Sequence, residues 1–266
     1  MKVLRGVAAL LMGASLMGCL ALAQDFPAKD GGDAITMPSP SEKSKWPTPV
    51  ADSANYSYVL FDLLEFQRIR GINALRWDAL GWYGGDKHRL WIKSEGEQYG
   101  SSHSGGELDV QALYGKLISP FFDLQTGLRY EKHFESNNPQ RVFAVVALQG
   151  LAPGRFEINP EFFVSNKGKT SMRFTGTYET LLTQRLVLQP RFETEIAFQR
   201  DNEFGVPRGV NDVEVGLRLR YEFRRELAPY IGVTFRQSFD VTAQRVLRER
   251  GVPNALEFVI GVRMWR

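Results

Sequence analysis

The sequence contains pairs of carboxylates two residues apart, the spacing that places both side chains on one face of a β-strand. Glu193 and Glu195 form one such pair, and Glu107 and Asp109 form another. Two carboxylates on a common face can hold a divalent cation through their oxygen atoms, although weakly. Whether such a pair meets a cation depends on what its face lines, and therefore on the fold.

The segment EVGLRLRYEF, residues 214–223, indicates the kind of strand that carries these pairs. Glu214, Arg218 and Arg220 fall on one parity, and the leucines and aromatic residues fall on the other. A period of two predicts a β-strand with two unlike faces. The polar face carries four charges in this one segment, which is unusual unless the face lines a wet interior.

Twelve segments with this alternation follow one another between residues 57 and 265. Most have about 9–13 residues, which suits tilted strands that cross a membrane. The connections alternate between short turns, such as SP after the fourth segment, and long loops, such as RDNEFGVPRGVN after the ninth. The pattern predicts an all-β fold: a transmembrane up-and-down antiparallel β-barrel of about 12 strands, spanning residues 56–266.

Some features fit this barrel less simply. Asp62 and Glu65 fall on opposite parities of the first segment, which leaves its inward face undetermined. Pro160, Pro190 and Pro229 lie inside expected strands, so bulges or strand ends are expected there. A soluble sandwich or a lipocalin-like barrel is the alternative, but sandwich strands average only about 5–6 residues.

The N-terminal residues 1–23 are typical of a secretory signal peptide, with Lys2 and Arg5 before an apolar stretch and an A-x-A site ending at Ala23. Alternatively, the lipobox-like LMGC would leave Cys19 lipidated at the mature N-terminus. Cys19 is the single cysteine of the chain, so the folded part has no disulfide or thiolate metal site. Residues 24–55 are rich in Pro, Ser, Lys and Asp, which predicts a disordered periplasmic extension.

In a closed barrel the polar parity faces the lumen. Strands two to twelve carry 14 acids against 9 bases on that parity, which predicts a lumen with a net charge near −5. A surplus of carboxylates favours cations over anions along a water path. The alternative is a structural role, in which Arg–Glu ladders hold the wall together. The acids expected to attract cations are Glu107, Asp109, Glu157, Glu161, Glu193, Glu195 and Glu214.

Several segments together resemble the copper resistance protein B family of the bacterial outer membrane. They are WDALGWYGGDKHRLWIKSEGE, DVQALYGKLISPFFDLQTGLRY, LQGLAPGRFEINPEFFVS, LLTQRLVLQPRFE and EVGLRLRYEFRRELAPYIGV. The resemblance covers about residues 58–265. It implies localisation in the bacterial outer membrane, a role in copper resistance and homeostasis, copper as the metal that is bound or passed, and a periplasmic multicopper oxidase as a candidate partner.

The sequence departs from this family in its N-terminal extension. Members usually carry a segment rich in Met and His, the ligands that copper selects, whereas the extension here holds only Met37 and no histidine. The three histidines, His88, His103 and His133, are expected in one short turn and two long loops. These four residues are the candidate metal ligands of the chain.

The remaining function classes find little support. A net charge of +3, dispersed along the chain, predicts no nucleic-acid partner. Outer-membrane lipases need a histidine base inside a strand, and none is expected there, so the chain is predicted not to be an enzyme. We therefore expect a barrel in contact with outer-membrane lipid that binds or passes copper ions. The alternative is a structural or small-solute barrel without metal specificity.

Overall fold

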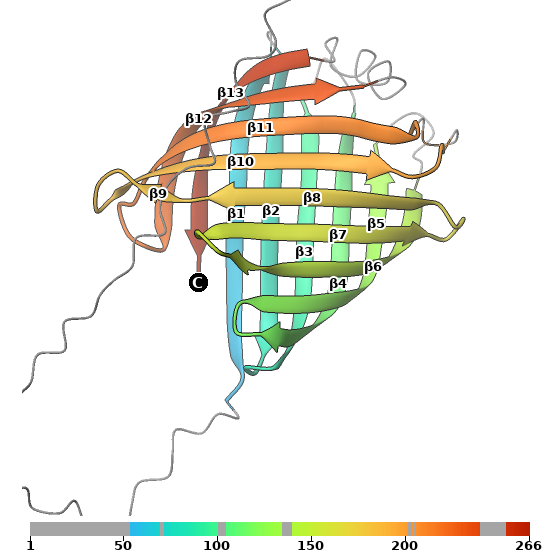
Figure 1. Ribbon diagram of the computed structural model, residues 1–266. Coiled ribbons are helices and arrows are strands. Elements are labelled where there is room, and N and C mark those ends of the chain that lie inside the picture. The colour runs from blue at the N-terminus through green and yellow to red at the C-terminus, as the bar shows by residue number, and fades with distance from the viewer. Residues whose placement is uncertain are drawn as a thin grey trace, which may run out of the picture. The chain divides into compact units, whose positions relative to one another are not determined.

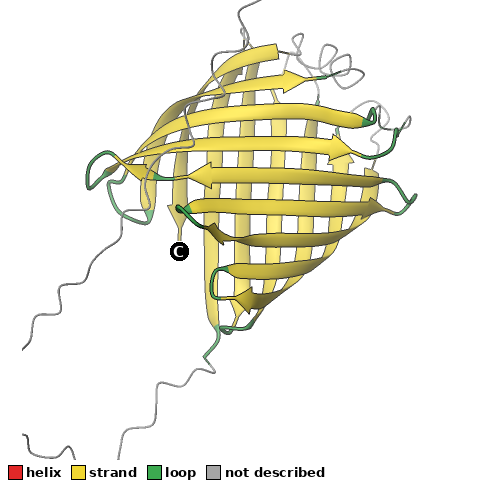
Figure 2. Cartoon of the chain, viewed as in Figure 1, coloured by secondary structure: helices red, strands yellow, loops and turns green. Residues whose placement is uncertain are grey.

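The protein is described here by a computed structural model, which describes residues 54–69, 72–100, 105–134, 140–201, 204, 206–239 and 254–266. The expected signal peptide and all but the last two residues of the expected extension lie outside these residues. Figure 2 shows strands joined by turns throughout the described part. None of the described residues forms a helix that could cross a membrane.

Thirteen strands make up the fold. They are β1 (Tyr56–Ile69), β2 (Ile72–Gly84), β3 (His88–Tyr99), β4 (Gly106–Ser119), β5 (Phe122–His133), β6 (Gln140–Ala152), β7 (Phe156–Ser165), β8 (Thr170–Tyr178), β9 (Thr180–Leu181), β10 (Leu186–Ala197), β11 (Gly209–Tyr221), β12 (Leu227–Ser238) and β13 (Asn254–Trp265).

These strands close into a single antiparallel barrel (Figure 1). β13 pairs with β1, so the two ends of the sheet meet and no edge is left unpaired. β8 and β9 both pair with β10 and occupy one position in the wall, which gives twelve positions. The predicted twelve-stranded up-and-down barrel is confirmed.

Proline explains why that one position is interrupted. Arg191 on β10 pairs with Thr177 at the end of β8, and Leu188 pairs with Thr180 on β9, so Pro190 lies opposite the break. Proline has no backbone N–H and cannot donate to a ladder on its side of the strand. The expectation of bulges or strand ends at the prolines is wrong for their own strands, because β7, β10 and β12 run through Pro160, Pro190 and Pro229. At Pro190 the break falls in the neighbouring strand instead.

A β-bulge settles the ambiguous parity of β1. Its register with β2 shifts between Phe61 and Leu63. A bulge inserts one extra residue, so acids on opposite parities can both face inward. Asp62 accepts hydrogen bonds from arginines on β10 and β13, and Glu65 accepts from Arg218 on β11. Both acids of β1 therefore belong to the lumen.

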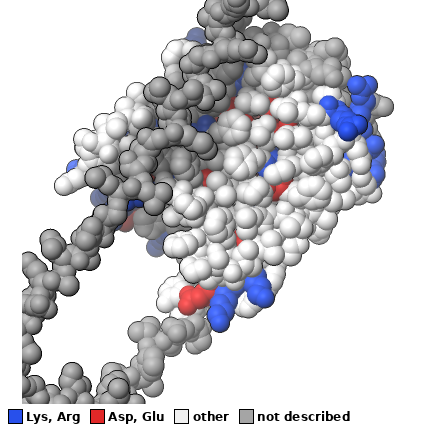
Figure 3. Space-filling model, viewed as in Figure 1, with Lys and Arg blue, Asp and Glu red and all other residues white. Residues whose placement is uncertain are grey.

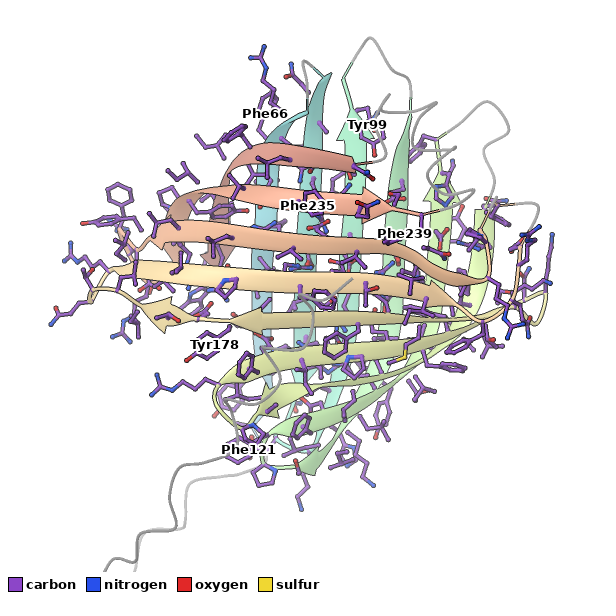
Figure 4. The ribbon with its side chains drawn as sticks, turned by 45° about the horizontal axis from the view of Figure 1, so that its top comes forward. Phe66, Tyr99, Phe121, Tyr178, Phe235 and Phe239 are labelled. Atoms are coloured by element: carbon purple, nitrogen blue, oxygen red, sulfur yellow. The ribbon has the colours of Figure 1, made fainter. Side chains whose placement is uncertain are left out.

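The outward parity is apolar. Large exposed side chains such as Leu90, Ile92, Leu128, Phe258 and Ile260 are each at least 60% accessible to solvent. In Figure 3 the visible wall is largely uncharged, and most of its charged side chains gather at the rims. Figure 4 places aromatic side chains near both rims, with Phe66 near the long-loop ends and Phe121 at a short turn. This is the surface that a membrane-spanning barrel presents to lipid.

Buried ion pairs tie the wall together from inside. Arg218 and Glu65 are 1% and 0% exposed, and Arg218 Nε donates to Glu65 Oε1 at 2.6 Å. Two glycines make room for this arginine, since a Cβ on Gly216 or Gly232 would meet its side chain. β1 and β11 are thus joined across the two strands that separate them in the sheet.

Replacing Glu65 by alanine should destabilise the barrel. The guanidinium of Arg218 would remain buried without its carboxylate, which costs about 3–5 kcal/mol. The free energy of unfolding in detergent micelles, followed by heat-dependent gel mobility, measures the loss. Glu179→Ala is the matched control, because Glu179 is half exposed and its partner Arg220 keeps Glu222 at 3.5 Å. An equal loss in both variants would contradict this account of the wall.

Candidate cation site in the barrel lumen

A cavity of about 160 Å³ lies inside the barrel, among the strand ends nearest the long loops. Its acidic lining residues are Asp78, Glu95, Glu97, Glu107, Asp109, Glu131, Glu193, Glu195, Asp212 and Glu214. Its basic lining residues are Arg76, Arg129, Arg141, Arg173 and Arg236. With ten carboxylates and five guanidinium groups, the described residues that line the cavity carry an excess of negative charge.

Each of the arginines that line the cavity contacts more than one carboxylate. Arg76 Nη1 donates to Glu214 at 2.6 Å, and its Nη2 donates to Glu193 at 3.3 Å. Arg236 likewise contacts Glu214 at 2.9 Å and Glu97 at 3.0 Å. These shared contacts link β10, β11 and β12 to β2 and β3. They keep the buried charges paired, as a low-dielectric interior requires.

Two further arginines pair the acids on the far side of the cavity. Arg173 contacts Glu95 at 2.9 Å and Asp109 at 3.5 Å. Arg129 contacts Asp109 at 2.5 Å and Glu131 at 3.0 Å. Asp109 is thus held between two guanidinium groups, and its negative charge is largely compensated.

Glu195 and Asp212 differ from these acids. They are directly opposite each other on β10 and β11. Neither has an ion-pair partner within 4 Å among the described residues. Arg173 is the strand neighbour of Glu195 on its other side, but it contacts Glu95 and Asp109 instead. Two carboxylates in this position repel each other unless a cation compensates them.

Five of the seven acids predicted to attract cations line this cavity: Glu107, Asp109, Glu193, Glu195 and Glu214. The other two, Glu157 and Glu161, are not among its lining residues. Glu161 is buried and accepts from Lys93 Nζ at 3.0 Å, and Glu157 lies at the start of β7, near a short turn.

The two predicted same-face pairs are present but are not pairs of free acids. Arginines hold Glu193 in one pair and Asp109 in the other. The pair without a basic partner, Glu195 with Asp212, joins two strands and was not predicted. The sequence signal for Asp212 is its spacing of two residues from Glu214, which places both acids on one face of the strand.

The predicted positions of the histidines need correction. His88 begins β3 and His133 ends β5, so neither lies in a turn or loop. His88 contacts the Tyr114 hydroxyl at 2.5 Å on the outer wall. His133 is only 4% exposed, contacts Glu131 Oε1 at 2.7 Å and lies beside Phe204. His133 is therefore a buried hydrogen-bonding group and not an exposed loop residue.

Met37 and His103, the other candidate metal ligands, lie outside the described residues. Among those that are described, no group of three or more His, Cys, Asp or Glu residues could hold a metal ion. A cation in this part of the chain would therefore need other oxygen donors beside its carboxylates.

Another part of the lumen is apolar. Trp91, Leu113, Phe143, Val145 and Phe163 form a buried cluster on the inward parity of β3, β4, β6 and β7. Such packing leaves little room for water on that side of the barrel. The polar cavity is lined instead by residues of β2–β6, β8 and β10–β12 near the long-loop ends of these strands.

Comparisons with known proteins agree with the fold and the family resemblance. The family described as copper resistance protein B precursor matches residues 55–266. Copper resistance protein B of Escherichia coli is 42% identical over 216 residues, covering 81% of this chain and 71% of that protein. A copper resistance protein B homolog of Pseudomonas syringae pv. tomato is 37% identical over 216 residues, covering 81% and 72%.

Solved structures give the same architecture at low identity. The NanC porin superposes with a TM-score of 0.51 and 14% identity, covering 79% of this chain and 99% of that one. Outer membrane phospholipase A from Escherichia coli gives 0.50 and 10%, covering 77% and 92%. These likenesses concern the barrel fold alone.

The charge of the cavity can be measured with a single cysteine. Ser238 lines the cavity, and the barrel has no cysteine of its own. In Ser238→Cys, a positively charged methanethiosulfonate should react about tenfold faster than a negatively charged one, because an acidic recess concentrates cations. The reagents are added to whole cells, and the reaction rate is followed by the increase in mass of the labelled protein.

Asn166→Cys is the control for this measurement. Asn166 is exposed in the turn between β7 and β8, at the same end of the barrel and beside Lys167. The preference for the cationic reagent should vanish there. Equal rates for the two reagents at Ser238→Cys would mean that the recess has no negative potential.

Proposed function

The chain belongs to the copper resistance protein B family and forms a β-barrel of the outer membrane, and we propose that its lumen gathers copper cations. In this proposal the cations enter the acidic cavity from the long-loop side, which is the extracellular side in barrels of this kind. The barrel would then contribute to copper resistance by holding copper or passing it onward. The observation that carries the proposal is the cavity's ten carboxylates against five arginines.

The positions of the charged groups in the cavity support this proposal as well as the excess of carboxylates does. Five arginines are bound to carboxylates, so the charge that remains is that of acids without a basic partner. Glu195 and Asp212 supply two of these negative charges at one place. Carboxylates around a wet recess attract cations and repel anions.

Copper is the cargo in this proposal and not a resident cofactor. Among the described residues that line the cavity there is one histidine, His133, and neither Met nor Cys, so the donors that they offer are chiefly oxygen atoms. The N-terminal extension, with Met37 alone, adds a single soft ligand to the chain. A periplasmic multicopper oxidase is the partner to which copper would pass.

The second candidate function is that of a structural barrel, or of a barrel that passes small solutes, without metal specificity. The apolar cluster and the fully buried Arg218–Glu65 pair favour it, because both fill the lumen with groups that serve the wall. In that case the acidic surplus would be incidental. Neutralising it without touching the wall's ion pairs separates the two candidates.

We further infer that the barrel is not an esterase. A lipase of the Ser-His-Asn type needs its histidine hydrogen-bonded to a serine. His88 on the outer wall contacts Tyr114 instead, and His133 faces inward and contacts Glu131. Neither of these two histidines, which are the ones in the described part of the chain, has the geometry of such a base.

Glu195→Gln combined with Asp212→Asn should lower copper tolerance. The two substitutions remove negative charge from the cavity and leave every ion pair described above intact. In a deletion strain, the wild-type gene should restore survival in copper, and the double variant should restore it only partly. Survival and cell-associated copper are measured together, with zinc as the comparison metal.

Glu157→Gln combined with Glu179→Gln is the matched control, since it removes the same charge near the short turns. This control should restore tolerance like the wild type, and heat-dependent gel mobility verifies that both variants are folded. If a folded Glu195→Gln, Asp212→Asn barrel restores full tolerance, the acidic cavity is only scaffolding.

A further inference from the structure

A second β-bulge lies at the unpaired acids. β10 and β11 are in one register as far as Glu195 and Asp212, and the next pair is Ile196 with Val210. Asn211 is therefore an extra residue in β11. Two residues of a bulged strand oppose one residue of the partner. The bulge explains why the neighbours Asn211 and Asp212 both line the cavity, although they differ in parity.

The side-chain oxygen of Asn211 is buried and unpaired. The residue is 4% exposed, and its Oδ1 accepts no hydrogen bond from the described residues, whereas its backbone carbonyl accepts from the N–H of Phe239. An amide oxygen that is taken from water and left unpaired is costly. A buried polar atom of this kind in a recess calls for a partner there, such as a water molecule or an ion.

The carboxylate beside it is held in place. Asp212 Oδ1 accepts from the backbone N–H of Glu195 at 3.2 Å, and the Asp212 carbonyl accepts from Thr194 Oγ1 at 2.9 Å. Ser238, buried on β12, is the strand neighbour of Asp212 on its other side. Glu195, Asp212, Asn211 and Ser238 thus present oxygen donors to one end of the cavity.

We propose that Glu195, Asp212 and Asn211 form an oxygen-ligand site for a divalent cation and that copper occupies it as Cu(II). Two carboxylates balance a divalent charge, and the amide and hydroxyl oxygens complete a set of hard donors. For a given site of oxygen and nitrogen ligands, Cu(II) binds most tightly among the first-row divalent metals. Cu(I) prefers sulfur ligands, and none of the described residues that line the cavity supplies one.

This inference refines the proposed function, since it rests on cations entering the cavity. It adds the oxidation state of the bound copper and the position of its binding site in the cavity. It also gives the bulge a role, because without the extra residue Asn211 and Asp212 could not face the same recess.

The test uses the mature protein extracted from membranes in detergent and titrated with Cu(II) sulfate alone. Electron paramagnetic resonance should detect one saturable Cu(II) per barrel with the spectrum of oxygen ligands. Asp212→Asn and Asn211→Leu should each weaken binding about tenfold or more, because affinity follows ligand number and charge. Asn211→Asp, which adds a carboxylate, should bind at least as tightly as the wild type.

Glu179→Gln, near the short turns, should leave the affinity unchanged, and gel mobility verifies that each variant is folded. Unchanged affinity in folded Asp212→Asn and Asn211→Leu would overturn the site. A spectrum dominated by nitrogen coupling would also overturn it, since it would assign the copper to histidine. If copper tolerance nevertheless depends on Glu195 and Asp212, the cavity acts through its overall charge, and the proposed function stands without this site.

Discussion

A charge inside a narrow barrel must be paired or compensated, and the interior of this protein is arranged around that constraint. Arginines on β2, β8, β10 and β12 reach across the lumen and each contacts more than one carboxylate. Arg191 contacts Asp62, Asp78 and Glu193 within 3.3 Å, so a single side chain connects three strands. Carboxylates outnumber arginines in the cavity lining, and the acids left over collect where no arginine reaches. The same pairing that stabilises the wall therefore decides where a cation could be held.

Two β-bulges determine which acids enter the lumen. In β1 a bulge brings Asp62 and Glu65 to the same face, and both are paired with arginines. In β11 a bulge brings Asn211 and Asp212 to the cavity, where neither has an ion pair among the described residues. The two bulges thus have opposite consequences. One adds acids that cross-link the wall, and the other adds oxygen atoms that remain available.

Much of the fold could be predicted from the sequence, because alternation and turn length are local properties of the chain. The twelve wall positions and the inward parity of β11 follow from such patterns. The site could be predicted only in part, because ion pairing depends on register across the lumen. Arg76 and Glu214 are 138 residues apart, and no local pattern shows that they meet. The bulge at Asn211 changes parity within one strand, so the alternating pattern does not show that Asn211 faces the lumen beside Asp212.

Uncompensated carboxylates at the β10–β11 bulge are proposed to hold a cation. Diffraction data collected at the copper absorption edge, from crystals of the barrel soaked in a Cu(II) salt, test this proposal most directly. We expect an anomalous density peak inside the cavity, next to Glu195 and Asp212. Copper bound only at the outer wall, for example at His88, with no peak in the cavity, would contradict it.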